Sequence, residues 1–283
     1  MIKIYTILKS LIMNLFFRSG KVMQIRKGPL KGYRYVVKPD TGFASILGRW
    51  EMKSQLVYQH SIFKDFVVFD LGANYGIHSM LYSKLVGAKG KVFAYEPLQG
   101  NKADIKEHIR LNQIQNIQVV PEAISNKKGY AEFKVAGHRG QGSLIGIGKQ
   151  TSETVRVDTN SLDNFSKATN ILPDFVKIDI EGAEGLALEG FTETVNSSYP
   201  FFAIDLHTPA NDLEVGKFLS AHGYEVYRVN DSSAQSMRKW NTLLERVEYL
   251  DKPWPTLKGI WGVIWAVHPS RKSSVEEFIN ANT

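Results

Sequence analysis

An α/β fold, built on a mostly parallel sheet with helices on both faces, is what the 283-residue sequence predicts. One observation is that residues 67–69 are uniformly apolar and lead through a glycine turn into residues at helical spacing. The other is that apolar runs and helical patterns alternate along most of the chain. Uninterrupted apolar runs are typical of strands buried on both faces, so helices are expected on both sides of the sheet.

Composition is that of a soluble globular protein, since 43% of the residues are hydrophobic and 22% are charged. The length allows one large domain or two small ones. The chain has no cysteine, which excludes a disulfide framework, a thiolate metal site and a cysteine nucleophile.

Positive charge is concentrated at the N-terminal end. Residues 1–39 hold nine of the 35 lysines and arginines and no acidic residue, so the remainder, with 26 basic and 28 acidic residues, is close to neutral. An enzyme that acts on nucleic acid is expected to line its groove with positive charge. The near-neutral body therefore argues against a nucleic-acid substrate.

A basic amphipathic segment is expected over residues 1–24, followed by an N-terminal subdomain over residues 25–60. Residues 2–17 form an apolar run that is too short and too often interrupted to span a bilayer. Two interpretations stay open: a helix on the inner membrane surface, contacted through residues 1–38, or a helix packed on the sheet or on a partner subunit. The expected location is the cytoplasm. If residues 1–38 contact the membrane, the protein would lie at its inner surface.

The turn after residue 69 predicts a nucleotide-binding unit. Asp70 closes the strand, and Gly72 and Gly76 flank a tight turn that opens a helix, as in the first half of a βαβ unit. The dinucleotide pattern G-x-G-x-x-G would need glycine where Asn74 and Ile77 stand. S-adenosyl-L-methionine (SAM) has no pyrophosphate and does not need those glycines, so a SAM site is the better interpretation and an NAD-dependent oxidoreductase is the alternative.

A second strand over residues 91–97 carries Glu96 near its end, about 20 residues past the glycine turn. A carboxylate at this place can accept both ribose hydroxyls of an adenosine-containing ligand.

The other elements follow from apolar periodicity and turn residues. Before the glycine turn we expect a turn and strand over 25–37 and a helix over 50–58. After Glu96 we expect helices over 101–111 and 213–222. The strands expected after Glu96 cover 117–122, 175–180, 200–206, 224–229 and 259–267. Antiparallel strands are expected over 130–135 and 154–157, joined by a glycine-rich loop that is typical of a lid or substrate loop. The polar stretch 230–256 is expected to be a mobile insertion.

Several short motifs, in this order and spacing, resemble those of the FkbM-type SAM-dependent methyltransferases. They are D-L-G-A-N-Y-G at 70–76, A-Y-E-P at 94–97, E-A-I-S at 122–125, S-L-D at 161–163, K-I-D-I-E-G-A-E at 177–184 and D-L-H at 205–207. The resemblance implies a class I methyltransferase domain over residues 61–283, with a seven-stranded, Rossmann-like sheet. It also implies methyl transfer to a hydroxyl oxygen of a glycan, glycolipid or natural product. The family more often has glutamate where Asp205 stands.

Ligands of open α/β sheets bind outside the carboxyl ends of the strands, so the residues that follow each strand are the candidate site. At the amino-acid end of SAM we expect Asp70, Gly72, Asn74 and Gly76; at the ribose, Glu96; and near the adenine, Glu122 and Ala123, with Asp179 also placed in the cofactor site.

The predicted catalytic residues are His207, Asp179 and Glu181. A hydroxyl acceptor must lose its proton, and an imidazole can be neutral near pH 7, so His207 is the leading general base while the two carboxylates orient it or the acceptor. Structural roles stay open for two of these residues. His207 could be a strand-end histidine that is hydrogen-bonded to the backbone, and the Glu181 carboxylate could complement the dipole at a helix N-terminus.

No metal is expected, although Asp179, Glu181, Asp205 and His207 could together offer ligands to Mg²⁺. The expected partner is a small-molecule or glycan acceptor, not nucleic acid. A catalytically inactive scaffold that keeps the fold is the non-enzyme alternative.

Overall fold

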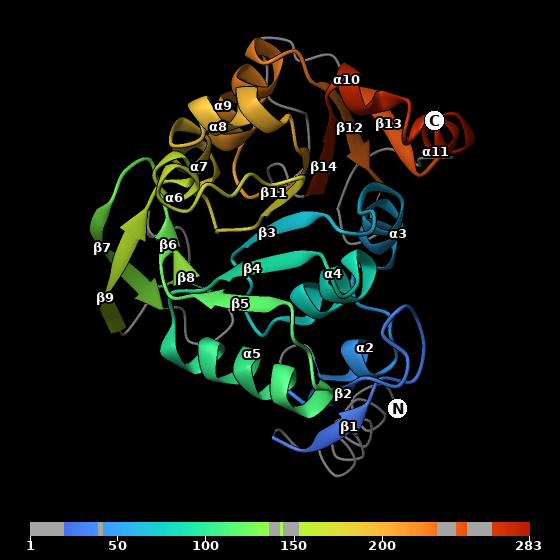
Figure 1. Cartoon of the computed structure of the whole chain (residues 1–283), viewed down its shortest axis with the longest axis vertical. Coiled ribbons are helices and arrows are strands. Elements are labelled where there is room, and N and C mark those ends of the chain that lie inside the picture. The colour runs from blue at the N-terminus through green and yellow to red at the C-terminus, as the bar shows by residue number, and fades with distance from the viewer. Residues whose placement is uncertain (1–19, 39–41, 136–141, 144–152, 231–241, 248–261) are drawn as a thin grey trace, which may run out of the picture.

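The structure is a computed structural model that describes residues 20–38, 42–135, 142–143, 153–230, 242–247 and 262–283 (Figure 1). Its strands are β1 (Val22–Gln24), β2 (Arg34–Val36), β3 (Val67–Leu71), β4 (Lys91–Tyr95), β5 (Ile117–Val120), β6 (Ala123–Ile124), β7 (Gly129–Val135), β8 (Gly142–Ser143), β9 (Glu153–Asn160), β10 (Phe175–Ile178), β11 (Phe201–Leu206), β12 (Glu225–Val229), β13 (Leu244–Val247) and β14 (Gly262–Val267). Its helices are α2 (Gly42–Ile46), α3 (Met52–Ser61), α4 (Ile77–Val86), α5 (Gln99–Asn112), α6 (Leu162–Thr169), α7 (Glu184–Glu189), α8 (Thr192–Ser198), α9 (Pro209–Ala221), α10 (Pro269–Lys272) and α11 (Glu276–Asn282).

Within the described residues, the main sheet has eight strands in the order β13-β12-β14-β11-β10-β3-β4-β5. The strands from β11 to β5 are parallel, whereas β14 pairs antiparallel with both β11 and β12. The carboxyl ends of β3, β4, β10 and β11 therefore meet at one edge of the sheet, which is where ligands of such sheets bind.

Strand alternation divides the core between the two faces of the sheet. Val68 and Phe201 point toward α3, α4 and α11, while their neighbours Phe69 and Phe202 point toward α6 to α9. Both members of each pair are almost completely buried. The predicted α/β architecture, with a mostly parallel sheet and helices on both faces, is confirmed (Figure 1).

A smaller sheet, ordered β6-β9-β7-β8, lies beside the carboxyl end of β5 (Figure 1). The predicted antiparallel pairing of 130–135 with 154–157 is confirmed by the ladder between β7 and β9. Most of the glycine-rich loop between them lies outside the described residues, and its expected role as a lid or substrate loop stays a prediction.

The antiparallel pair β1–β2 packs beside α5, low in Figure 1. The Val36 amide donates to Nε2 of His108 at 2.9 Å, while Nδ1 of the same ring lies 2.8 Å from the Tyr75 carbonyl. Residues from this region, including Tyr35 and Val57, join the core cluster of one sheet face. The domain boundaries at 24 and 60 stay predictions, and residues 1–19 lie outside the described part.

In the described ranges, no helix has the length and apolar character needed to cross a membrane.

The sheet differs from the sequence prediction at its edge. Residues 244–247, expected within a mobile insertion, form β13 and pair antiparallel with β12, so the sheet gains a strand beyond the seven expected. The segment contains both Glu245 and Arg246, and a strand this polar is stabilised by its partner rather than by its own pattern.

Candidate active site

The carboxyl ends of β3, β4 and β10 border a cleft that is open to solvent and encloses about 590 Å³ of empty space. Polar groups come from the strand ends, and most of the remaining wall is apolar. The lining residues are Gly72, Asn74, Tyr95, Glu96, Pro97, Leu98, Asn101, Glu122, Ala123, Ile124, Phe133, Asp179, Ile180 and Glu181.

The turn after β3 is fixed between β4 and β10. Gly72 has a φ of 78°, and a Cβ there would lie 1.9 Å from the carbonyl oxygen of Asp179, so this approach requires glycine. The backbone N–H groups of Gly72 and Ala73 both donate to the Tyr95 carbonyl, at 3.1 and 3.0 Å. The three strand ends are thereby held together at the base of the cleft.

Glu96 presents a buried carboxylate to the cleft. The Asn74 amide donates to its Oε2 and the Leu98 amide donates to its Oε1, both at 2.9 Å. Burial raises the pKa of Glu96 to about 7, although these hydrogen bonds act in the opposite direction. Each oxygen keeps lone-pair capacity for further donors, such as the hydroxyls of a ribose.

Tyr95, Leu98, Ile124 and Phe133 give the cleft its apolar wall. Glu122 lies among them, and its carboxylate accepts a hydrogen bond from Asn160 Nδ2 at 3.0 Å. Flat apolar surfaces with one anchored carboxylate suit a purine ring with an exocyclic amine.

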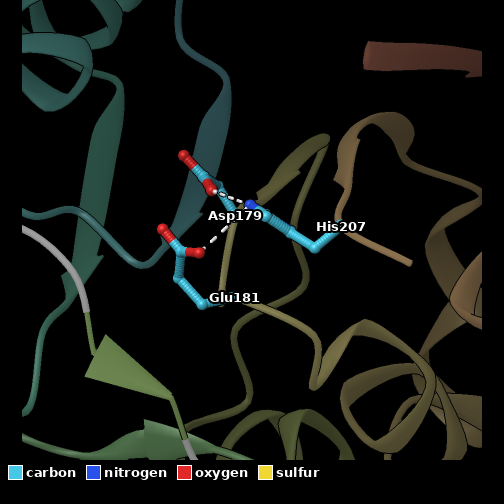
Figure 2. Close-up of side chains that lie close together, drawn as sticks. All are labelled: Asp179, Glu181 and His207. Atoms are coloured by element: carbon cyan, nitrogen blue, oxygen red, sulfur yellow. Dashed lines mark ion pairs between the residues drawn. The ribbon is translucent and has the colours of Figure 1, made fainter. Parts of the chain in front are cut away.

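Asp179, Glu181 and His207 form a group at the end of the cleft (Figure 2). Nε2 of His207 lies 3.5 Å from Asp179 Oδ1 and 3.6 Å from Glu181 Oε2. Asp179 and Glu181 come from the segment after β10, and His207 follows β11, the neighbouring parallel strand. The backbone of Glu181 has a φ of 52°, which lies in the left-handed region that residues other than glycine and asparagine rarely adopt. Such strain is typical of functional positions.

The ring of His207 is oriented by Glu184, which is completely buried. Nδ1 of His207 donates to Glu184 Oε1 at 2.9 Å, because a carboxylate can only accept. Glu184 is itself held by the Gly182 amide at 3.0 Å and by Asn211 Nδ2 at 2.8 Å. The imidazole therefore presents Nε2 to Asp179 and Glu181.

Charge around the group sets its titration. Lys177 Nζ donates to Asp179 Oδ2 at 2.9 Å. Burial by itself would raise the pKa of Asp179. The positive charges of Lys177 and His207 outweigh the effect of burial, so the pKa of Asp179 is lowered. Burial disfavours the imidazolium of His207, yet the hydrogen bond to Glu184 and the charge of Asp179 outweigh it and raise the pKa of His207 to about 10. In this arrangement His207 is a cation at pH 7, unlike the neutral imidazole expected from its residue type. Burial and the charge of Asp179 raise the pKa of Asp205 to about 7.

Six of the eight residues predicted to bind the cofactor line the cleft, and the other two, Asp70 and Gly76, are not part of its lining. Asp70 is fully buried, and its Oδ2 accepts a hydrogen bond from Ser79 at 2.5 Å. Gly76 begins α4, where a Cβ would lie 3.0 Å from Ile105. The three predicted catalytic residues are brought together, two of them in the lining itself.

Sequence reasoning missed the supporting roles of Glu184 and Lys177. A single lysine inside an otherwise apolar strand was the available signal for Lys177, because a buried ammonium needs a carboxylate partner. Glu184 belongs to a motif that the sequence shows, but only the fold brings it beside His207.

A cleft at the strand ends of such a sheet, with a carboxylate after β4 and a group of titratable side chains after β10 and β11, is the arrangement of a class I methyltransferase. Residues 70–226 match the model of the methyltransferase FkbM domain, so the chain belongs to the FkbM methyltransferase family.

Among known proteins, hexuronic acid methyltransferase AglP from Haloferax volcanii is 27% identical over 161 residues, which are 56% of this chain. The match spans 62% of that protein, less than two thirds of its length. Among solved structures, methyltransferase FkbM from Methylobacillus flagellatus is similar at a TM-score of 0.48 and 18% identity, over 73% of this chain and 44% of that one. Precorrin-6y C5,15-methyltransferase from Geobacter metallireducens is similar at a TM-score of 0.47 and 15% identity, over 82% and 94% of the two chains.

SAM is the cofactor of this methyltransferase, and the cleft fits it. The Glu96 carboxylate matches a ribose diol, and the apolar wall with Glu122 matches an adenine. Asp179 and Glu181 add two carboxylates to the lining, and their negative charge suits the cationic sulfonium and ammonium of SAM.

Proposed function

We propose that the chain transfers the methyl group of SAM to a hydroxyl oxygen of a sugar, in a glycan, a glycolipid or a glycosylated natural product. The observation that carries this proposal is that Asp179 and Glu181 belong to two sites at once. They line the cofactor cleft, and they also face Nε2 of His207. Proton-transfer groups therefore stand directly beside the place of methyl transfer.

SAM supplies a methyl group on a sulfonium, and the protein must align an oxygen behind that carbon and remove its proton. A neutral hydroxyl is a poor nucleophile, so hydrogen-bond acceptors must hold its proton as the new bond forms. Asp179 and Glu181 provide such acceptors, and His207 fixes them by its charge. We assign the acceptor hydroxyl to these three residues and its proton to the carboxylates of the group.

A nucleobase or protein amine fits the chain less well. Methyltransferases of that class carry an Asn/Asp-Pro-Pro-aromatic run after the corresponding strand, whereas this chain has Asp179, Ile180, Glu181 and Gly182 there. In that run, backbone atoms and the aromatic ring receive the planar amino group. This chain lacks them at the corresponding residues after β10.

The name of the relative from Haloferax volcanii supports a sugar acceptor, since a hexuronic acid is a sugar that bears a carboxylate. Such an acceptor offers two oxygens of different kind. Its hydroxyls need a proton acceptor in the enzyme, whereas its carboxylate is already ionised at pH 7. The acid–base group favours the hydroxyl.

The test is transfer of an isotope-labelled methyl group from SAM to a panel of hexuronic acids and neutral hexoses, free and linked to nucleotide or lipid carriers. We expect a methyl ether that survives mild alkali. A product that mild alkali hydrolyses would be a methyl ester and would contradict the assignment to a hydroxyl. Label that appears in no sugar while it appears in protein or nucleic acid would contradict the acceptor class.

A further inference from the structure

We propose that Asp179, Glu181 and His207 bind a divalent cation of the Mn²⁺ or Mg²⁺ class; this deepens the proposed methyl transfer and rests on it. The three side chains offer two carboxylate oxygens and one imidazole nitrogen, and these atoms all lie within 4.8 Å of one another. Figure 2 shows the imidazole directed at both carboxylates. Carboxylates suit cations such as Mg²⁺ and Mn²⁺, and the imidazole adds one nitrogen ligand.

The two distances from His207 are slightly longer than those between ligands of one cation. Nε2 of His207 lies 3.5 Å from Asp179 and 3.6 Å from Glu181, which is too long for a good hydrogen bond to either. Two ligand atoms that each lie about 2.1 Å from a shared cation, at angles between 90° and 110°, are roughly 3.0–3.5 Å apart. A small closure of the group would meet that geometry.

The orientation of the ring is what a metal-binding histidine requires. Nδ1 donates to the buried carboxylate of Glu184, so a cation would bind at Nε2 and displace the proton there, and Nε2 faces two carboxylates. Ligating histidines almost always donate their second N–H to such a carboxylate, which fixes tautomer and direction. Glu184 is not one of the three ligands, and it is anchored independently by Asn211.

The carboxylates are also arranged for a cation. Asp179 uses Oδ2 to bind Lys177, which leaves Oδ1 directed at the group. Glu181 holds a left-handed backbone conformation that brings its carboxylate beside His207. Both carboxylates border the SAM cleft, so the open side of a bound cation would face the methyl donor.

A cation there would bind the acceptor hydroxyl and make it more acidic. The hydroxyl oxygen then forms a bond to the methyl carbon, the S–C bond of SAM breaks and its electron pair stays on sulfur. With Asp179 and Glu181 engaged as ligands, the hydroxyl proton passes to Asp205, a carboxylate outside the ligand set, instead of to those two carboxylates. Asp205 follows Ile204, whose register partner on β10 is Ile178, the residue before Asp179, so the two carboxylates lie on neighbouring strands at the same level.

The experiment is calorimetric titration of chelator-treated full-length protein with MnCl₂ alone, with S-adenosylhomocysteine titrated separately. We expect one saturable Mn²⁺ site per chain. His207→Ala should weaken Mn²⁺ binding at least about tenfold, with S-adenosylhomocysteine affinity within about twofold of wild type. Unchanged cofactor affinity shows that this variant is folded.

Glu107→Gln is the matched control, because Glu107 is an exposed carboxylate that pairs with Arg110 on α5. It should bind Mn²⁺ like the wild type. Absence of a saturable site, or binding that His207→Ala leaves unchanged, would overturn the inference. Methyl transfer that persists in excess chelator would overturn it while leaving the proposed function intact. Mn²⁺ binding at this site, in a protein that methylates no sugar, would support the site and contradict the proposed function.

Discussion

The buried carboxylate of Glu184 accepts a hydrogen bond from Nδ1 of His207 at 2.9 Å and thereby directs Nε2 of the ring at Asp179 and Glu181. The two residues come from different elements, since Glu184 begins α7 and His207 follows β11. The contact joins α7 to the group that Asp179, Glu181 and His207 form. It makes Glu184 a positioning residue for His207.

Replacing Glu184 with glutamine tests this role. The amide keeps the shape but loses the charge, so we expect turnover to fall about 10–100-fold while S-adenosylhomocysteine affinity changes little. The free energy of unfolding should fall by about 1.5–3 kcal/mol, because a charge-assisted hydrogen bond is weakened in a buried place. Glu189→Gln on the same helix is the control, since Glu189 is exposed and accepts only from Asn126 among the bonds described. Equal turnover in the two variants would remove the positioning role.

Cofactor binding should depend on pH through Glu96, whose pKa is raised to about 7 by burial. Ribose hydroxyls need the ionised carboxylate as acceptor, so affinity for S-adenosylhomocysteine should be highest above pH 7 and about tenfold weaker at pH 6. Calorimetry across this range checks it, with Glu96→Gln as a variant of low, pH-independent affinity. A flat wild-type profile would contradict the assignment of Glu96 to the ribose.

Without cofactor, the contribution of Glu96 to the stability of the protein should fall as the pH rises, whereas cofactor affinity should increase. The pKa of Glu96 is higher in the folded protein than its ordinary value of 4.5, so the folded state binds more protons between these values. This group therefore adds stability as the pH falls from about 7 toward 4.5, and that contribution is lost as the pH rises through 7. Denaturant unfolding of wild type and Glu96→Gln across this range measures the difference between them.

The turn after β3 should not tolerate a side chain at Gly72. A Cβ would lie 1.9 Å from the Asp179 carbonyl oxygen, and φ is 78°, so Gly72→Ala should lower the free energy of unfolding by about 2–4 kcal/mol. Gly100→Ala is the control, because no atom lies within 4 Å of a Cβ there and its place in α5 favours alanine. Equal unfolding midpoints for the two variants would contradict the close approach of β3 and β10.

The backbone conformation of Glu181 should lower the stability of the fold, while its carboxylate supports activity. Its φ of 52° is unfavourable for a residue with a side chain, so Glu181→Gly should keep or slightly raise the free energy of unfolding, by up to about 1 kcal/mol. Turnover should fall strongly because the carboxylate is removed. A clearly destabilised variant would show that Glu181 serves the fold rather than the chemistry.

The sequence predicted the central sheet and most of the cleft because both depend on local signals. Residues 67–76 combine an apolar strand, a glycine turn and a helix start, and the structure keeps all three. Glu96, Asp179 and His207 follow strands, and a parallel sheet brings strand ends together whatever the rest of the chain does. The rule that ligands bind at this edge therefore sufficed to group them.

What could not be predicted depends on contacts between distant segments. β13 is polar and forms only by pairing with β12. Asp70 was expected to close its strand at the cleft, but β3 continues to Leu71, and Asp70 is buried with its carboxylate against Ser79 of α4. The proton state of His207 depends on Glu184 and Asp179, and residue type alone predicted the neutral form.

The most direct test of the central claim compares single-turnover methyl transfer by wild type and His207→Ala, both saturated with SAM and with the same sugar acceptor. If the Asp179–Glu181–His207 group handles the acceptor hydroxyl, the variant will bind S-adenosylhomocysteine like the wild type and transfer the methyl group at least about 100-fold more slowly. A rate equal to that of the wild type would show that the hydroxyl is activated elsewhere, and the account of this site would be wrong.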